Sequence, residues 1–258
     1  MRVGPCGLLV VLLAMRASVA AAGQPLETES TRLLRAHQFE VEAGFEHQAA
    51  DGGGETAVPW AIGYGIRNDL ELLFEPVLYD RITDGNGFAT RGLGDLEATL
   101  TYRFAQERAG RPALALAFEA KLPTAKSPRI GTGQPDYTIW AIASKAAGHW
   151  DTHVDLGYTL VGRPAHVDVQ DIVNYGLATE WKVTPVVELV GEIYGASAAL
   201  ANTGTGGENN GTPELGGADF VTAIGARLAT ASGWTPSLGV SVDRQGAVTV
   251  HPGMSRRF

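Results

Sequence analysis

Apolar and polar residues alternate with a period of two through almost all of this chain. Residues 92–104, GLGDLEATLTYRF, are the clearest case, with Leu96 and Phe104 on one face and Asp95 and Arg103 on the other. A period of two is typical of a β-strand with one apolar and one polar face. No helical period persists and no run of 18 apolar residues occurs, so membrane-spanning helices are excluded. The sequence therefore predicts an all-β fold, although a soluble sheet and a lipid-facing barrel produce the same alternation.

The first 22 residues have the three parts of an export signal. Arg2 is followed by the short apolar run 7–14 and then by the small residues ASVAAA at 17–22. This is the arrangement of a secretory signal peptide, which cleavage removes. We therefore expect residues 1–22 to be a signal peptide. Cys6, the only cysteine, lies inside it, so we expect the mature chain to have neither a disulfide nor a thiolate metal site.

The charge balance argues against a nucleic-acid partner. The formal net charge is −8 and becomes about −10 when Arg2 and Arg16 leave with the signal peptide, whereas nucleic-acid-binding proteins carry basic surfaces. Charged residues make up 19% of the chain, below the ~25% of ordinary soluble domains. The composition thus favours an exported protein with little charged surface.

The alternating segments are separated by connections that differ in length. We expect about twelve strands in residues 36–258, after a polar periplasmic lead-in or short plug at 23–35. Outer-membrane barrels have short periplasmic turns and longer outer loops, and an even strand count leaves both termini on the periplasmic side. The longer predicted connections lie near 49–54, 81–91, 123–135, 163–170 and 198–216, and the shorter ones near 67–69, 105–111, 147–149, 182–185 and 230–234.

Aromatic residues near the strand ends favour a barrel whose apolar face meets lipid, because such barrels carry aromatic girdles at both interfaces. The chain also ends on Phe258 after an alternating strand, which is similar to the terminal signal that the barrel-assembly machinery reads. We therefore predict a transmembrane antiparallel up-and-down β-barrel of the bacterial outer membrane, in contact with its lipid and lipopolysaccharide. The expected girdle residues are Trp60, Tyr64, Tyr79, Tyr102, Phe104, Trp150, Tyr158 and Trp181.

Several motifs resemble a known family of outer-membrane barrels. TESTRLL, FEVEAGFEH, GYGIRNDLELLFEP, GLGDLEATLTYRF and FEAKLPTA resemble the family called "putative MetA-pathway of phenol degradation", and the likeness covers most of residues 27–258. Its most specific parts are the G-[IL]-x-[ND]-x-x-[EQ] turn at 65–71 and the G-x-G-D segment that begins at residue 92. The resemblance implies a β-barrel transporter of small solutes, including hydrophobic or aromatic (phenol-like) compounds. No catalytic motif comes with it.

The polar face of the predicted strands is acidic and has few basic partners. In a barrel this face lines the lumen, where carboxylates must be hydrated or paired. One hypothesis is a water-filled passage that favours cations, since rings of charge select solutes. The alternatives are an ion-paired filling, which makes a structural or binding barrel with a blocked lumen, and an outer-membrane enzyme. The residues expected along the lumen and solute path are Glu42, Glu71, Glu75, Glu97, Arg103, Glu119, Lys121, Asp155, Glu188 and Glu192.

Four polar residues at alternate positions, His149, Asp151, His153 and Asp155, share one strand face. Alternate side chains are roughly 7 Å apart, whereas metal ligands converge within about 2–2.5 Å of one ion. We therefore expect hydrated lumen polarity there rather than a metal or proton-transfer site.

Two loops are candidates for ligand contact. The glycine-rich run 202–217 lacks the Lys-Ser/Thr of a phosphate loop, and no G-x-S-x-G occurs, so we expect no enzymatic activity, no cofactor and no metal. The basic segment 121–133 is a candidate for contact with anionic lipopolysaccharide or with substrate.

Overall fold

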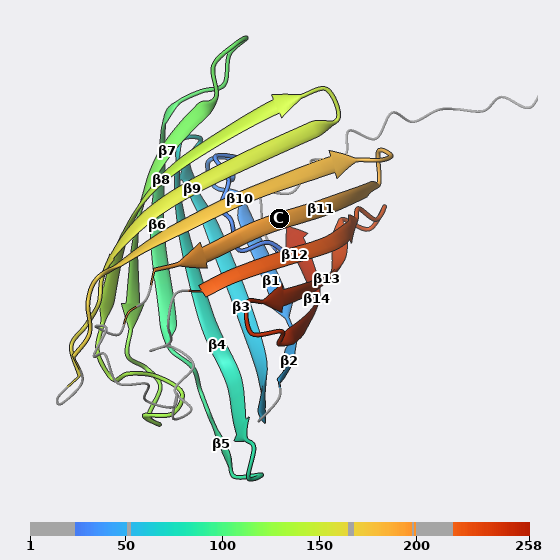
Figure 1. Ribbon diagram of the computed structural model, residues 1–258. Helices are drawn as coiled ribbons and strands as arrows, with labels where there is room; N and C mark the ends of the chain where they lie inside the picture. The colour runs from blue at the N-terminus through green and yellow to red at the C-terminus, as the bar shows by residue number, and fades with distance from the viewer. Residues whose placement is uncertain (1–23, 51–52, 165–167, 198, 200–218) are drawn as a thin grey trace, which may run out of the picture.

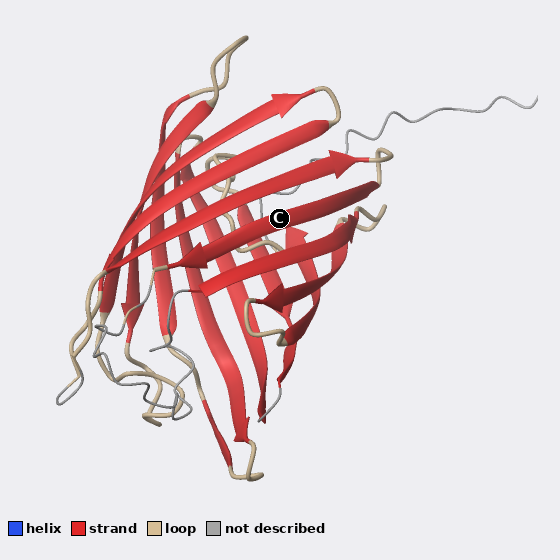
Figure 2. Cartoon of the chain, viewed as in Figure 1, coloured by secondary structure: helices blue, strands red, loops and turns tan. Residues whose placement is uncertain are grey.

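The computed structural model describes residues 24–50, 53–164, 168–197, 199 and 219–258. In these ranges the chain forms one antiparallel sheet that closes on itself (Figure 1). Figure 2 shows strands joined by turns and loops, and no helix in the described ranges is long and apolar enough to cross a membrane. The predicted signal peptide and the run 202–217 lie outside the described residues.

The sheet contains fourteen strand segments in the described part of the chain. They are β1 (Phe39–Gly44), β2 (Glu46–Ala50), β3 (Gly53–Arg67), β4 (Leu70–Asp84), β5 (Ala89–Gly92), β6 (Leu96–Ala105), β7 (Ala113–Leu122), β8 (Asp136–Ala147), β9 (Trp150–Leu160), β10 (Ile172–Lys182), β11 (Val187–Ala196), β12 (Asp219–Leu228), β13 (Trp234–Asp243) and β14 (Val248–Arg257).

These segments build twelve barrel strands, as the sequence predicted, because two strands are interrupted. β1 and β2 are parts of one strand split at Phe45, whose N–H donates to the carbonyl oxygen of Pro252 on β14 at 2.9 Å. Pro252 has no N–H to return to this ladder, which accounts for the break. β5 and β6 are likewise separated by residues 93–95. Each strand pairs with its neighbours in the chain, and pairing of β1 with β14, from Glu40 opposite Arg257 to Gly44 opposite Gly253, closes the barrel.

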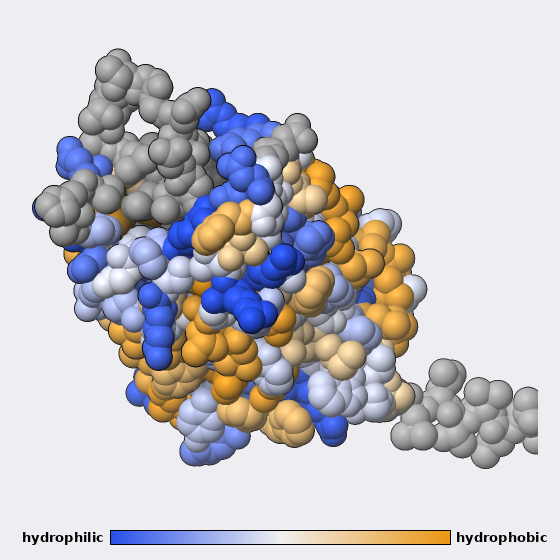
Figure 3. Space-filling view, turned by 90° about the horizontal axis from the view of Figure 1, so that it is seen from below, coloured by the Kyte–Doolittle hydropathy of each residue, from blue (hydrophilic) through white to orange (hydrophobic). Residues whose placement is uncertain are grey.

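The apolar face of the strands is on the outside. On β9 the side chains of Asp151, His153 and Asp155 are buried, while those of Val154 and Leu156 between them are exposed. Figure 3 shows apolar residues in broad patches on the outer surface. A soluble protein buries such residues and exposes the polar ones, so this inverted arrangement is that of a barrel in lipid.

The aromatic girdle is largely as expected. Of the eight residues predicted for it, all but Trp60 are exposed. Trp60 is only partly exposed and borders a cavity in the lumen. Trp150 and Trp181 stack on neighbouring strands with ring centroids 5.4 Å apart, at the end of the barrel that also carries both chain ends of the sheet.

Two expected long connections are instead short, because the strands continue through them. β3 begins at Gly53, and β4 runs to Asp84. Asp84 accepts hydrogen bonds at its Oδ1 from the backbone N–H groups of Asn86 and Phe88, both at 3.0 Å. Gly87 has a φ of 79°, which glycine adopts without strain, so a tight turn replaces the loop predicted at 81–91.

The barrel should behave as a lipid-facing protein in solution. Folded in detergent, it is expected to show strand-dominated circular dichroism and to migrate differently on gels before and after boiling, since the outward apolar face needs detergent or lipid. Far-ultraviolet spectra and unboiled gels check this. A detergent-independent, helical or soluble monomer contradicts the fold.

Phe258 remains a predicted assembly signal. Its backbone exchanges hydrogen bonds with Phe39, N to O at 2.7 Å and 3.1 Å, and its ring is 62% exposed with the Arg256 guanidinium over it. Phe258→Ala keeps the backbone pair and removes the ring. We expect it to lower the folded outer-membrane fraction far more than Arg256→Lys does, as measured by unboiled gels of membrane fractions. Equal folded fractions remove the role of the ring.

Candidate functional site

Residues 24–36, called here the plug segment, lie inside the barrel. The segment enters beside the β3–β4 turn, where the N–H of His37 donates to the carbonyl of Gly65 at 2.7 Å and that of Ala36 to Asn68 Oδ1 at 3.0 Å. It then crosses the lumen, and the carbonyl of Gln24 accepts a hydrogen bond from Arg227 Nε of β12 at 3.0 Å. The plug segment therefore contacts opposite sides of the wall.

Carboxylates of the wall accept hydrogen bonds from the backbone of the plug segment. An irregular segment inside a barrel has no sheet partner, so its N–H groups need other acceptors. Carboxylates supply the stronger, charge-assisted bonds. The N–H of Gln24 donates to Glu42 at 2.7 Å, that of Glu27 to Glu192 at 3.0 Å, that of Glu29 to Asp155 at 2.5 Å, and that of Leu34 to Glu71 at 2.5 Å, while Thr28 also donates to Glu192.

An ion-paired cluster fixes the end of the plug segment nearest the short turns. Arg32 pairs with Glu180 and, at 2.6 Å, with Asp151. Glu180 is 0% exposed and also pairs with Arg227 at 2.7 Å. Lys182 completes the cluster by pairing with Asp151 at 2.6 Å. Because each buried charge here has an opposite charge in contact, this part of the lumen is the paired filling that the sequence left open as an alternative.

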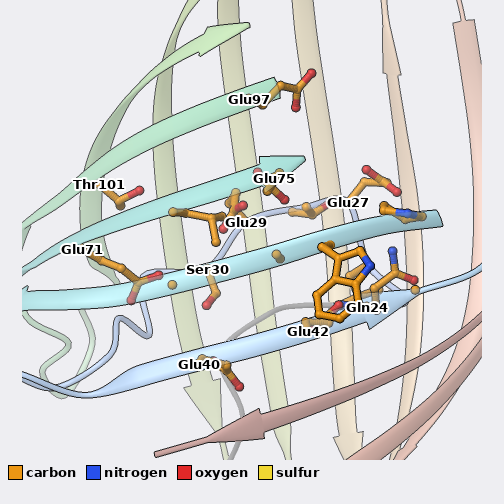
Figure 4. A pocket seen from close by; sticks show the side chains of 18 of the residues that line it. Gln24, Glu27, Glu29, Ser30, Glu40, Glu42, Glu71, Glu75, Glu97 and Thr101 are labelled. Carbon is orange, nitrogen blue, oxygen red and sulfur yellow. The ribbon is translucent and has the colours of Figure 1, made fainter. Parts of the chain in front are cut away.

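The other side of the plug segment has acidic walls with fewer basic residues. A cavity of about 290 Å³, called here the acidic cavity, lies between the plug segment and strands β4 to β11. Figure 4 shows a neighbouring pocket, lined also by Gln24 and Glu42, into which Glu27 and Glu29 of the plug segment and Glu75 of β4 project, with Glu97 on the next strand. Glu119 accepts the indole N–H of Trp140 at 2.8 Å. Residues lining the acidic cavity include Glu27, Glu29, Glu75, Glu97, Glu119, Trp140 and Asp155.

The barrel wall encloses Glu29, which belongs to the plug segment and to no spanning strand. This enclosure, together with the facing carboxylates of Asp155, Glu71 and Glu119, raises the pKa of Glu29 well above its usual range. A carboxylate with many like charges nearby and few cations favours its neutral form. A cation placed among these carboxyl groups would instead favour their ionised form.

All ten residues expected along the lumen lie on the inner side of the wall, but they do not share one environment. Glu42, Glu71, Asp155 and Glu192 hold the plug segment. Glu188 contacts Arg227 of the ion-paired cluster at 3.3 Å. Arg103 donates to the carbonyls of Thr31 and Asn68, and Lys121 pairs with Asp136 at 2.6 Å. The remaining three, Glu75, Glu97 and Glu119, line the acidic cavity. Their role in a solute path stays a prediction.

The alternating His and Asp residues of β9 are engaged by the protein itself, and His153 also lies 3.4 Å from Arg32 and 3.6 Å from Glu180 of the ion-paired cluster. His153 Nδ1 lies 2.9 Å from Ser144 Oγ, Asp151 belongs to the ion-paired cluster, and Asp155 holds the plug segment. Within the described ranges no group of three or more His, Cys, Asp or Glu side chains is placed to hold a metal ion.

Sequence reasoning missed Arg32 and Trp140. Arg32 lies in a segment whose apolar and polar residues do not alternate, so the residues next to it in sequence do not predict its partners on β9 and β10. Trp140 belongs to residues 137–145, where apolar side chains occur on both faces. The signal that was available is the small size of Gly157, because a Cβ there would come within 2.6 Å of the Trp140 ring, and an inward tryptophan needs such space.

The first family motif, at residues 65–71, is the receptor for the plug segment. A Cβ on Gly65 would come within 2.0 Å of the carbonyl oxygen of Arg35, so only glycine admits the segment there. Asn68 accepts the Ala36 N–H and Glu71 accepts the Leu34 N–H. The residues of this motif therefore bind the plug segment in addition to forming the turn.

The second motif, G-x-G-D at 92–95, receives the loop between β7 and β8. Thr124 Oγ1 donates to the carbonyl of Gly94 at 2.9 Å, and the N–H of Ala125 donates to Asp95 Oδ1 at 2.9 Å. Arg129 of the same loop pairs with Asp84 at 3.0 Å. Two basic residues of 121–133 are therefore engaged within the protein, Lys121 being the other, and contact of this segment with lipopolysaccharide stays a prediction.

The fold and its polar lumen define a β-barrel of the kind that outer-membrane porins and channels share. The chain belongs to the family described as "Putative MetA-pathway of phenol degradation", whose pattern matches residues 22–250. The resemblance stated from the motifs is thereby confirmed.

Three solved structures illustrate the likeness in fold. The COG4313 outer membrane channel from Pseudomonas putida F1 superposes with a TM-score of 0.70, covering 88% of this chain and 98% of that chain at 13% identity. The KdgM porin gives a TM-score of 0.57 over 84% and 99% of the two chains at 9% identity, and the NanC porin gives 0.57 over 84% and 98% at 9% identity. Among curated proteins none matches this chain.

Loss of the Arg32 charge should release the plug segment. Arg32→Met leaves Asp151 and Glu180 with one cation fewer, which we expect to weaken docking by about 2 kcal/mol, the size of a charged hydrogen bond. Ser30 is buried, so Ser30→Cys places a thiol on the segment. In the Arg32→Met background this thiol should react with a soluble maleimide roughly thirtyfold faster, since reaction requires opening.

Arg67→Met is the matched control, because Arg67 pairs with Asp69 at 3.0 Å on an exposed turn. It should leave the labelling rate unchanged. Equal rates in the Arg32→Met and Arg67→Met backgrounds contradict a plug segment held by the ion-paired cluster.

Proposed function

We propose that this protein is an outer-membrane channel for small solutes in which the plug segment narrows the passage. The observation that supports this most directly is the placement of polar cavities on both sides of the plug segment. One of about 480 Å³ includes Arg32, Glu107 and Lys145 near the short turns. Another of about 500 Å³ includes Glu27, Glu55 and Asp243 toward the opposite end. Solvent thus reaches the plug segment from both directions.

The size of the interior spaces favours small solutes. The acidic cavity of about 290 Å³ is at the lower limit of pockets that enclose drug-sized ligands. Hydrophobic or aromatic, phenol-like compounds agree with the family to which the chain belongs and with Trp140 in the wall. The KdgM porin, similar in fold alone, has been described in complex with disordered oligogalacturonate, so barrels of this architecture admit small solutes.

The blocked-lumen barrel is the main competing function. Five carboxylate-accepted hydrogen bonds and the ion-paired cluster anchor the plug segment firmly. These contacts are polar and all lie on one short segment, so a modest rearrangement of that segment widens the passage without opening the sheet.

An outer-membrane enzyme is less well supported. Ser144, His153 and Glu180 do form a contact chain, with 2.9 Å from Ser144 Oγ to His153 Nδ1 and 3.6 Å from His153 Nε2 to Glu180. However, Ser144 Oγ also accepts the Thr31 N–H at 2.9 Å, all three side chains are buried, and Glu180 is shared by two arginines. A substrate carbonyl has no approach to this hydroxyl while the plug segment is docked.

Ion selectivity in planar bilayers tests the channel and its acidic wall together. Glu75→Gln with Glu97→Gln removes two negative charges from the acidic cavity and keeps their size, so reversal potentials under a salt gradient should shift toward anions. The shift should shrink at high salt, because the screening length is about 10 Å at 0.1 M. Glu71→Gln, which touches the plug segment instead, should change mainly the conductance.

Two results decide between the functions. A wild-type protein that neither conducts nor admits a small solute into liposomes supports the blocked barrel. A conducting protein whose selectivity is unchanged in the double variant shows that these carboxylates do not act as a filter.

A further inference from the structure

Two carboxylates that line the acidic cavity, those of Glu75 and Asp155, form no ion pair with any described residue. Glu75 forms no hydrogen bond and no ion pair with any described residue. Asp155 is 4% exposed, and while its Oδ2 accepts the Glu29 N–H, its Oδ1 is buried without a hydrogen-bond partner. A buried carboxylate oxygen without a donor is costly, so Asp155 Oδ1 points to a donor supplied by a ligand.

Most of the basic residues that face the lumen are engaged away from Glu75 and Asp155. Arg32, Lys182 and Arg227 belong to the ion-paired cluster at the other side of the plug segment. Arg103 donates to backbone carbonyls near the rim. Lys121, at the edge of this region, pairs with Asp136 and lies opposite Glu97 on the neighbouring strand, so it offsets charge at that edge and not at Glu75 or Asp155. Negative potential therefore accumulates in the acidic cavity, and low-dielectric walls focus it.

An aromatic surface adjoins these carboxylates. Trp140 lines the acidic cavity, its indole N–H is fixed by Glu119, and its ring lies against Gly157. A fixed tryptophan ring beside carboxylates attracts cations through the ring quadrupole and packs against apolar groups. The carboxylates do not converge as metal ligands within the described ranges, which favours a larger cation with several N–H donors.

We propose that the acidic cavity is a binding site for a compact organic cation with an aromatic or apolar body, such as a primary arylalkylamine. Its ammonium group donates to Asp155 Oδ1 and its ring packs on Trp140, while Glu75 adds negative charge to the wall of the same cavity. The plug segment completes the site through Glu29, so the site exists only while that segment is docked. This proposal deepens the proposed function, since it names a solute class that the passage would concentrate.

Binding to the detergent-folded full-length protein tests the site without requiring passage. Three probes of similar shape differ in charge: 2-phenylethylammonium, 2-phenylethanol and phenylacetate. Calorimetry should give an affinity for the ammonium probe at least about tenfold above that for the alcohol, the size of one charge-assisted contact, and no binding of the carboxylate. Added salt should weaken the ammonium probe and leave the alcohol unchanged.

Matched variants assign the contacts. Glu75→Gln should reduce affinity for the ammonium probe about tenfold and leave the alcohol unaffected, whereas Trp140→Leu should weaken both. Glu107→Gln, which removes the same charge at the rim where Glu107 pairs with Lys145 at 2.6 Å, should change neither. Unboiled gels check that each variant folds. If a variant does not fold, the comparison of the three probes on the wild-type protein still tests the proposal.

Equal affinities for the ammonium and alcohol probes, or an ammonium affinity that Glu75→Gln leaves intact, overturn the proposal. Failure of the channel function looks different, because a blocked barrel still binds the ammonium probe but shows no conductance. A channel that conducts and binds all three probes alike retains the proposed function and loses the cation site.

Discussion

The structure depends on hydrogen bonds between backbone N–H groups inside the barrel and carboxylates of its wall. Residues 24–36 carry amides that no strand pairs, and Glu42, Glu71, Asp155 and Glu192 accept them. Without the segment, these carboxylates would need water or cations, and without the carboxylates the segment would leave its N–H groups unsatisfied. The N–H groups of the plug segment and the carboxylates of the wall therefore stabilise one another. Binding of the plug segment thus explains the acidic lumen face as well as a solute would.

The lumen has two levels along the barrel axis, one on each side of the plug segment, and their charges are balanced differently. Near the short turns, Arg32 and Arg227 neutralise Glu180 and its neighbours, so the interior there is a paired filling. Beyond the plug segment, Glu75 has no counter-charge among the described residues and Asp155 retains an unpartnered oxygen. The ion-paired filling therefore describes the level near the short turns, and the charged passage stays a proposal for the level beyond the plug segment. Together the two levels are the basis for the proposed narrow, plugged passage with a chamber that binds cations.

The wall of the barrel could be predicted from sequence, because successive residues of each strand face lipid and lumen in turn. The alternation of apolar and polar residues is therefore visible within any short segment. Residues 150–160 show it well, and the twelve strands and the inward position of all ten expected residues follow. Prediction failed where local pattern and tertiary contact differ. Tight turns at Asp84 and Gly87 replaced a loop, Pro252 split a strand at Phe45, and apolar side chains on both faces of 137–145 concealed Trp140. The path of the plug segment, and hence the role of Arg32, depends on partners more than a hundred residues away, which no local pattern specifies.

Single-channel conductance of a form lacking residues 24–34 tests the central claim most directly. The deletion keeps His37 and Gln38 at the rim, where their backbones bond to Gly65, and removes the segment that crosses the lumen. The account predicts a severalfold larger conductance than that of the wild-type protein, with the sheet still folded by unboiled gel. A folded barrel whose conductance is unchanged by the deletion would show that these residues do not limit the passage, and would contradict the account.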